Sequence, residues 1–332
     1  MSKIVSIVLA AALIAQAALS AAAQQATPTP APTKTPTLTA AIIPTLEVTP
    51  EAGQLKSLAQ ADLAVLTGNV QKPNGFAWFN NKLYTACSGD GTVYEIDDTT
   101  GSTKAYIYGI KNAQTLYVEN DANNVLTLWV PDYEANVLTK VTRNRVETVA
   151  RNLNGPWGIS YVDEQHFLVT NLLSNSINLL SRDGDNQVLM DNLSAPMGVV
   201  HDDQTLYIAN YGSTRRSVEW YDYQAVAEGT QDSDSSVNHV LVKGLQNTTD
   251  VQLGTDGYLY FAYALGNRGL VGRVDPAVCK ANGGCTNDQV EIVLFSDLDA
   301  PLAGLTITPD MRMFVHTMFK PEIYWAKLDA GE

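Results

Sequence analysis

A recurring phrase constrains the fold of this chain more than any other feature. Each copy has an apolar run, a polar turn and a second apolar run, as in PWGISYVDEQHFLVTN (156–171) and APMGVVHDDQTLYIAN (195–210). A glycine near its start recurs at four places: Gly75, Gly158, Gly198 and Gly304. Two of these glycines lie 40 residues apart, and the other spacings, 83 and 106 residues, leave room for further units. The chain is therefore built from repeats of about 40 residues.

Six such units fit the sequence. A degenerate one begins near NAQTLYVEND, and in another Asp250 stands where the glycine would be. Each unit holds four short runs of β-branched and aromatic residues separated by Asp, Asn and Gly turns, which are strand signals. The sequence predicts an all-β fold, a six-bladed β-propeller with four-stranded blades. The one candidate helix is the segment 51–60.

The two ends of the repeat array predict how the ring closes. The last unit stops one strand short, and ADLAVLTGNV (61–70) resembles the fourth strands of the other units. We expect this N-terminal strand to close the last blade and so remove an open sheet edge. The insertions at 224–238 and 279–285 should lie between the outer strands of blades four and five.

The N-terminus has the composition of a leader and a spacer. Residues 1–23 combine Lys3, an apolar stretch and a small-residue site, which indicates a signal peptide or, alternatively, an uncleaved membrane anchor. Residues 24–60 form a Pro/Thr-rich spacer, and 61–330 form the propeller. We expect an exported protein, secreted or on the cell surface, which meets a membrane only through an uncleaved leader.

Charge and cysteine content narrow the classes of function. A net charge of -14 argues against nucleic acid as a partner. In an exported chain, Cys279 and Cys285 are expected to form a disulfide, with a metal knuckle as the alternative. Cys87 remains as a buried thiol, and we expect a monomer.

The phrase Pro-x-Gly followed by Leu-Tyr-x-Ala-Asn resembles the NHL-repeat and SMP-30/gluconolactonase-like group of six-bladed propellers. The resemblance covers about Leu63 to Leu328. It implies a ligand site on the face where the first strands begin and the second strands end. The group includes lactonases, lyases, quinone-dependent sugar dehydrogenases and binding modules, so that fold alone does not give the chemistry.

Acid and amide side chains are expected to gather on that face. Their oxygens suit Ca²⁺ or another divalent metal, and the candidate ligands are Asn74, Asp132, Asn171, Asn210 and Asp250. By the resemblance, Asn74 matches a metal-binding Asn-Gly entrance, and Asp132 or Asp250 would be the catalytic acid. The alternative is that Asp132, Asn171 and Asn210 only cap turns.

Four apolar or aromatic residues are expected at the channel mouth as ligand-binding groups: Trp157, Met197, Tyr211 and Tyr263. Packing between blades is the alternative for them, and for His316 and His201. The predicted function is a module that binds a small molecule or a protein through the channel face. The alternative is a divalent-metal-dependent hydrolase of the lactonase type.

Overall fold

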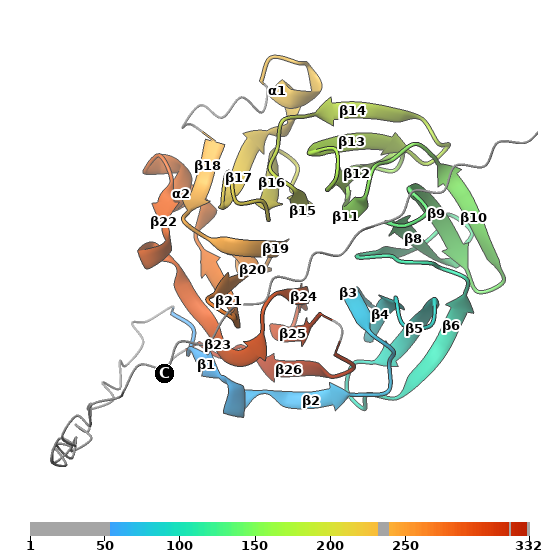
Figure 1. Cartoon of the computed structure of the whole chain (residues 1–332), viewed down its shortest axis with the longest axis horizontal. Coiled ribbons are helices and arrows are strands. Elements are labelled where there is room, and N and C mark those ends of the chain that lie inside the picture. Colours follow the sequence, from blue (N-terminus) through green and yellow to red (C-terminus); the bar gives the residue numbers. More distant parts are fainter. Residues whose placement is uncertain (1–53, 232–238, 319, 331–332) are drawn as a thin grey trace, which may run out of the picture. The chain divides into compact units, whose positions relative to one another are not determined.

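The strands form a ring of sheets around a central channel (Figure 1). The computed structural model describes residues 54–231, 239–318 and 320–330. Within these residues the chain forms six blades, and each has the four-stranded antiparallel sheet that the repeats predicted. The all-β, six-bladed propeller is therefore confirmed.

The blades follow one another along the chain. Blades one to three contain these strands: β3 (Pro73–Phe79), β4 (Lys82–Cys87), β5 (Thr92–Asp97), β6 (Thr103–Tyr108); β7 (Tyr117–Asn120), β8 (Leu126–Asp132), β9 (Val137–Thr142), β10 (Arg145–Ala150); β11 (Pro156–Tyr161), β12 (His166–Asn171), β13 (Ser176–Ser181), β14 (Asn186–Met190). Blades four to six contain these: β15 (Pro196–His201), β16 (Thr205–Asn210), β17 (Ser217–Asp222), β18 (Val240–Lys243); β19 (Gln246–Leu253), β20 (Leu259–Leu265), β21 (Arg268–Val274), β23 (Glu291–Asp299); β24 (Leu302–Ile307), β25 (Arg312–Thr317), β26 (Ile323–Lys327), and β2 (Ala64–Thr67).

The repeated glycine lies in a bulge at the start of the first strand. Pro156 pairs with Asn171 and Pro196 with Asn210, and the register then shifts before the strand continues. At Gly198 an added Cβ would lie 2.7 Å from the Asp250 Cα of the next blade. A side chain cannot fit there, so glycine is required where neighbouring first strands approach most closely.

Threonine hydroxyls join consecutive blades near the axis. Thr115 donates to the Trp157 carbonyl, Thr170 to the Met197 carbonyl, and Thr249 to the Leu302 carbonyl, each at 2.7 Å. Apolar side chains, including Trp129, Tyr207 and Phe261, fill the space between blades. The blades are thus joined by hydrogen bonds near the axis and by apolar packing further out.

The N-terminal strand closes the ring. β2 pairs antiparallel with β26, with Ala64 opposite Trp325 and Thr67 opposite Ile323. The last blade therefore takes its fourth strand from the beginning of the described chain, as the sequence predicted.

Two further short strands cover outer edges. β1 (Leu58–Ala59) lies parallel to β23 of blade five, and β22 (Cys285–Thr286) lies parallel to β18 of blade four. Residues 54–60, which composition assigned to the spacer, thus lie against the propeller. The helix expected at 51–60 was wrong for its described part: Leu58–Ala59 is a strand, because pairing with β23 outweighs its weak helical pattern.

The two insertions begin with short helices. α1 (Tyr223–Ala227) follows β17, and α2 (Pro276–Ala281) follows β21, at equivalent positions in blades four and five. The Cys279–Cys285 disulfide is present and fastens α2 to β22. The leader and most of the spacer lie outside the described residues. No helix in the described part of the chain is long and apolar enough to cross a membrane.

Candidate functional site

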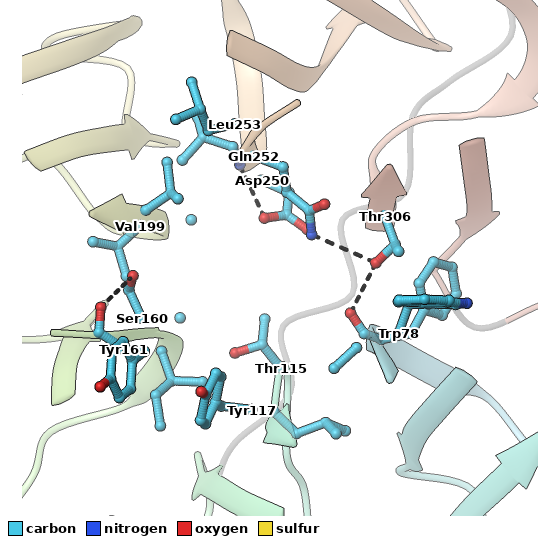
Figure 2. Close-up of a pocket in the computed structure, with 18 of the residues that line it drawn as sticks. Trp78, Thr115, Tyr117, Ser160, Tyr161, Val199, Asp250, Gln252, Leu253 and Thr306 are labelled. Carbon is cyan, nitrogen blue, oxygen red and sulfur yellow. Dashed lines mark hydrogen bonds between the residues drawn. The ribbon is translucent and has the colours of Figure 1, made fainter. Parts of the chain in front are cut away.

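A cavity of about 440 Å³ occupies the central channel (Figure 2). Its walls come from the first strands of all six blades, and they include the final residues of β11, β15 and β19. This cavity therefore lies toward the ends of the first strands. We call that side the exit face and the side of the predicted polar ring the entrance face.

One wall of the cavity is polar. Asp250 accepts hydrogen bonds from the Val251 N–H (2.9 Å) and from the Leu305 N–H of the next blade (3.2 Å). Gln252 lies beside it, within 3.5 Å of the Thr306 hydroxyl. The three side chains project from blades five and six toward the open channel.

Asp250 is half-buried, and its side chain lines the channel cavity among closely packed protein groups. Burial raises its pKa to about 7, and the two backbone N–H groups offset this only in part. Asp250 is the one acidic side chain that lines this cavity among the residues described. Near neutral pH both its protonated and its ionised forms are therefore populated, and either form can hydrogen-bond to a ligand.

The opposite wall carries aromatic rings. Tyr117 and Tyr161 are stacked, with ring centroids 5.7 Å apart, and Tyr161 keeps 38% of its surface exposed. Trp78 lines another sector of the channel, with its indole nitrogen directed away from the cavity (Figure 2). Val199 and Leu253 add apolar surface between these groups. The cavity thus presents hydrogen-bonding groups to one part of a ligand and rings to another.

Three members of the predicted polar ring hold loops of their own blades. Asp132 accepts from the backbone N–H groups of Lys111, Asn112 and Ala135. Asn171 and Asn210 use their Oδ1 atoms in the same way.

In these two residues the oxygen accepts from the loop that enters the first strand. Asn171 accepts from the Asn154 N–H and Asn210 from the Ser194 N–H, both at 3.0 Å. Asn74 differs, because its amide donates to the Ala113 carbonyl of blade two. All four ring residues are at least 97% buried.

These contacts bear on the predicted metal site. The oxygens of Asp132, Asn171 and Asn210 already accept backbone hydrogen bonds, and Asp250 accepts from two N–H groups of its own. Among the described residues, no group of three or more His, Cys, Asp or Glu side chains could hold a metal ion. Most of the candidate oxygens thus hold backbone groups in place, and a metal site at this ring stays a prediction.

The four predicted ligand-binding side chains lie outside the channel cavity. Met197 and Tyr263 are buried, and Tyr263 packs in the core between blades four and five. Trp157 and Tyr211 are half-buried, and Trp157 contacts Tyr133 edge-to-face. Met197 and Tyr263 are therefore packed within the propeller in this structure, and packing was the alternative to a ligand-binding role.

Sequence reasoning missed Trp78, Tyr117, Tyr161 and Gln252. It followed the resemblance to the entrance face, whereas these residues lie at the other end of the first strands. A signal was present, because polar or aromatic residues stand two or three positions after the repeated glycine or Asp250: Trp78, Tyr161, His201 and Gln252. All four of these residues line the channel cavity.

Two histidines lie close to the axis. His316 is fully buried between blades six and one, where its ring nitrogens contact the Asn74 and Thr317 carbonyls, and burial lowers its pKa to about 4. His201 lines the channel beside Tyr223, and burial lowers its pKa against the pull of Asp202 and other acids. Both are neutral at physiological pH.

The ring of sheets and the lined channel define the protein as a six-bladed β-propeller with a ligand-sized cavity. Searches against family models and curated sequences found no match.

Solved propellers resemble the chain in fold. A gluconolactonase from Xanthomonas campestris is 16% identical, with a TM-score of 0.61, over 80% of this chain and 89% of that one. A virginiamycin B lyase from Staphylococcus aureus is 12% identical, with a TM-score of 0.53, over 82% and 98%. A chain of a nidogen/laminin complex is 14% identical, with a TM-score of 0.50, over 69% and 82%. At these identities the likeness establishes the fold alone.

Proposed function

We propose that this protein is an exported binding module that takes a small ring-containing molecule into the exit face of its channel. The observation that carries the proposal is the cavity itself. Its volume of about 440 Å³ is in the usual range for small-molecule sites. It joins a few converging polar groups to aromatic and aliphatic walls, which is the composition that such sites share.

The lining groups suggest the chemistry of the ligand. Asp250 favours a hydrogen-bond donor, such as a hydroxyl, an amide N–H or an amine, whereas the Gln252 carbonyl already accepts the Ile307 N–H. Tyr117, Tyr161 and Trp78 favour a ring or another flat apolar surface. The ionised form of Asp250 and the net charge of -14 disfavour an anion. The ligand is therefore neutral or cationic, with a donor at one end and a ring at the other.

Fluorescence titration with N-phenyl-1-naphthylamine tests this proposal, because that probe is neutral, has aromatic rings and carries one N–H. We expect saturable binding that Tyr161→Ala weakens by roughly 5- to 10-fold, the usual worth of an aromatic contact. Tyr108→Ala is the matched control, since Tyr108 is 69% exposed on an outer strand away from the cavity. Equal loss in both variants, or no saturable binding to the wild type, would contradict the proposal.

A lactonase-type hydrolase is the second candidate. The gluconolactonase in the structural comparison supports it, and a carboxyl with a pKa near 7 suits general acid–base work. Calorimetry with calcium and lactone hydrolysis assays, on the wild type and on Asp250→Ala, test it. Heat and turnover that disappear in the variant would favour the hydrolase. Their absence in the wild type would remove it.

A further inference from the structure

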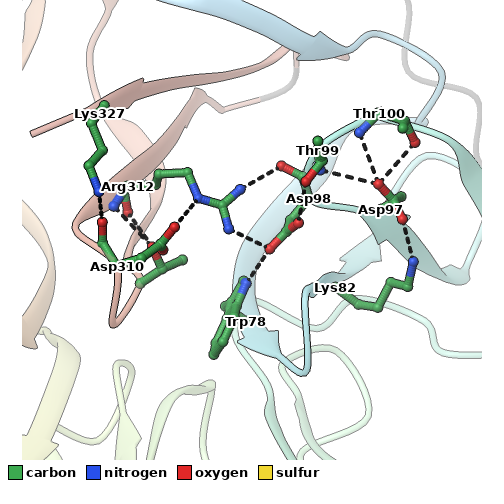
Figure 3. A network of polar contacts seen from close by, with 10 residues as sticks. Trp78, Lys82, Asp97, Asp98, Thr99, Thr100, Asp310, Arg312 and Lys327 are labelled. Carbon is green, nitrogen blue, oxygen red and sulfur yellow. Dashed lines mark hydrogen bonds and ion pairs between the residues drawn. The ribbon is translucent and has the colours of Figure 1, made fainter.

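The Trp78 indole is held by a neighbour behind the channel wall. Its N–H donates to Asp98 Oδ2 at 2.6 Å (Figure 3). Asp98 is 2% exposed, and it follows β5 on the outer side of blade one. One hydrogen bond therefore fixes the edge of the ring of a residue that lines the cavity and packs against the apolar cluster between blades six and one.

Asp98 is in turn held from the next blade. Arg312, at the start of β25, donates from Nη2 to Asp98 Oδ2 (2.8 Å) and from Nη1 to the Asp98 carbonyl (2.9 Å). Arg312 also donates from Nε to Asp310 (2.9 Å), whose backbone carbonyl accepts from Lys327. This network crosses from blade six to blade one, at the seam where the chain closes the ring.

The turn between β24 and β25 contributes both to the channel wall and to the network around Arg312. Pro309 lines the channel cavity, and the next residue, Asp310, holds Arg312. A shift of this turn would therefore move the channel wall and the support of Trp78 together.

We propose that Arg312 and Asp98 are positioning residues of the channel site. Neither residue lines the cavity, and they act by holding the Trp78 indole in the orientation that recognises the ring of the ligand. This inference rests on the proposed function, and it makes the seam between the last and first blades a determinant of ligand specificity. It also predicts a preference for flat ring systems over flexible chains, because a fixed indole is complementary to one ligand shape.

The chain contains a matched control for ordinary structural loss. Arg215 and Glu219 form an ion pair at 2.8 Å with side chains 13% and 4% exposed, which compares with 14% and 2% for Arg312 and Asp98. Neither Arg215 nor Glu219 lines the channel cavity. The two ion pairs are therefore almost equally buried, but only the Arg312–Asp98 pair holds a residue that lines the channel.

The experiment compares Arg312→Gln, Arg215→Gln, Trp78→Ala and the wild type, each labelled with 5-fluorotryptophan and titrated with N-phenyl-1-naphthylamine. We expect Arg312→Gln to weaken binding roughly 2- to 10-fold, the range for freeing one ordered side chain. The fluorine resonance of Trp78, assigned by its absence in Trp78→Ala, should shift or broaden in Arg312→Gln before any probe is added. Arg215→Gln should leave affinity and this resonance unchanged while it lowers the melting temperature to a similar extent.

Three outcomes separate the possibilities. If Trp78→Ala weakens binding but Arg312→Gln does not, the positioning role is wrong and the channel function survives. If Arg215→Gln weakens binding as much as Arg312→Gln, the effect is general destabilisation and the positioning role again fails. If the wild type does not bind the probe, the proposed function fails and this inference fails with it.

Discussion

Asp250 illustrates how one residue can depart from a repeat and alter the chemistry of a channel. In the other clear units glycine occupies this position because the next blade approaches too closely for a side chain. Here the carboxyl reaches forward and accepts the Leu305 N–H of blade six as well as the Val251 N–H. The departure therefore adds a contact between blades and places an acid of raised pKa in the channel.

The pH dependence of stability should report this acid. The pKa of Asp250 is about 7 in the folded state and about 3.9, the usual value, in the unfolded state. At pH values between these two, the folded state therefore keeps a proton that the unfolded state has lost. Stability attributable to Asp250 is therefore largest at low pH and falls as pH rises through 7. We expect the free energy of unfolding of the wild type to fall by about 1–3 kcal/mol relative to Asp250→Asn between pH 5 and 8.

Urea unfolding of both proteins at several pH values measures this difference. The amide group in Asp250→Asn would direct an N–H donor toward one backbone N–H, which costs the variant a constant amount of stability. Comparing how the two unfolding free energies change with pH removes this constant cost. Parallel pH profiles would show that the Asp250 pKa is not raised.

Residues that the sequence singled out and residues that it missed differ for a physical reason. The strand ends at Asp132, Asn171 and Asn210 were located correctly, because turn residues mark them in the chain. Their side chains face backbone N–H groups in the loops that enter the first strands, and the position of these loops cannot be read from the strand pattern. Strand patterns fix which residues end a strand, but the cavity depends on how six strands converge.

Short inserted elements cover the outer edges of two blades. α2 begins with Asp275 capping the Ala277 and Val278 N–H groups, and Lys280 reaches blade four, where it donates to Thr205 and lies over the Tyr207 and Trp220 rings. β22 then pairs with β18. An insertion in blade five therefore completes the edge of blade four.

Removing the disulfide should loosen this cover. The Cys279–Cys285 bridge closes a loop with a sequence separation of 6, for which the chain-entropy model gives about 2 kcal/mol. We expect the double change Cys279→Ala and Cys285→Ala to lower the free energy of unfolding by that amount and to speed amide exchange in β18. Urea unfolding and hydrogen exchange measure both effects.

Reductant provides the control for this prediction. It should destabilise the wild type and leave the double variant unchanged. Cys87 should not interfere, because it is buried and burial raises its pKa to about 12. Wild-type stability in the double variant would show that the bridge does not secure this edge.

The whole molecule depends on its closure. The six-unit count and the missing last strand predicted the ring from sequence, since strands and turns are encoded locally and each unit repeats them. β2 supplies the missing strand, and its Leu66 packs against the cluster that contains Phe314 and Ile323.

Truncation tests this closure. A chain that begins at residue 68 lacks β2, and we expect it to lose about 2–4 kcal/mol of stability or to aggregate through the open edge of β26. A chain that begins at residue 54 keeps every described strand and is the control. Thermal unfolding and size-exclusion chromatography compare the two. A wild-type melting temperature in the shorter chain would contradict the closing role of β2.

The order of contacts along the N-terminal segment has a mechanical consequence. Going from residue 54 toward β2, Leu55 first donates its N–H to Glu291 and pairs with Ala330, and β1 then lies along β23. A pull applied upstream of Leu55 is therefore taken up by blade five and by the C-terminal end before it reaches the strand that closes blade six. The contacts of Leu55 and β1 would therefore separate before the pairing of β2 with β26 bears such a pull.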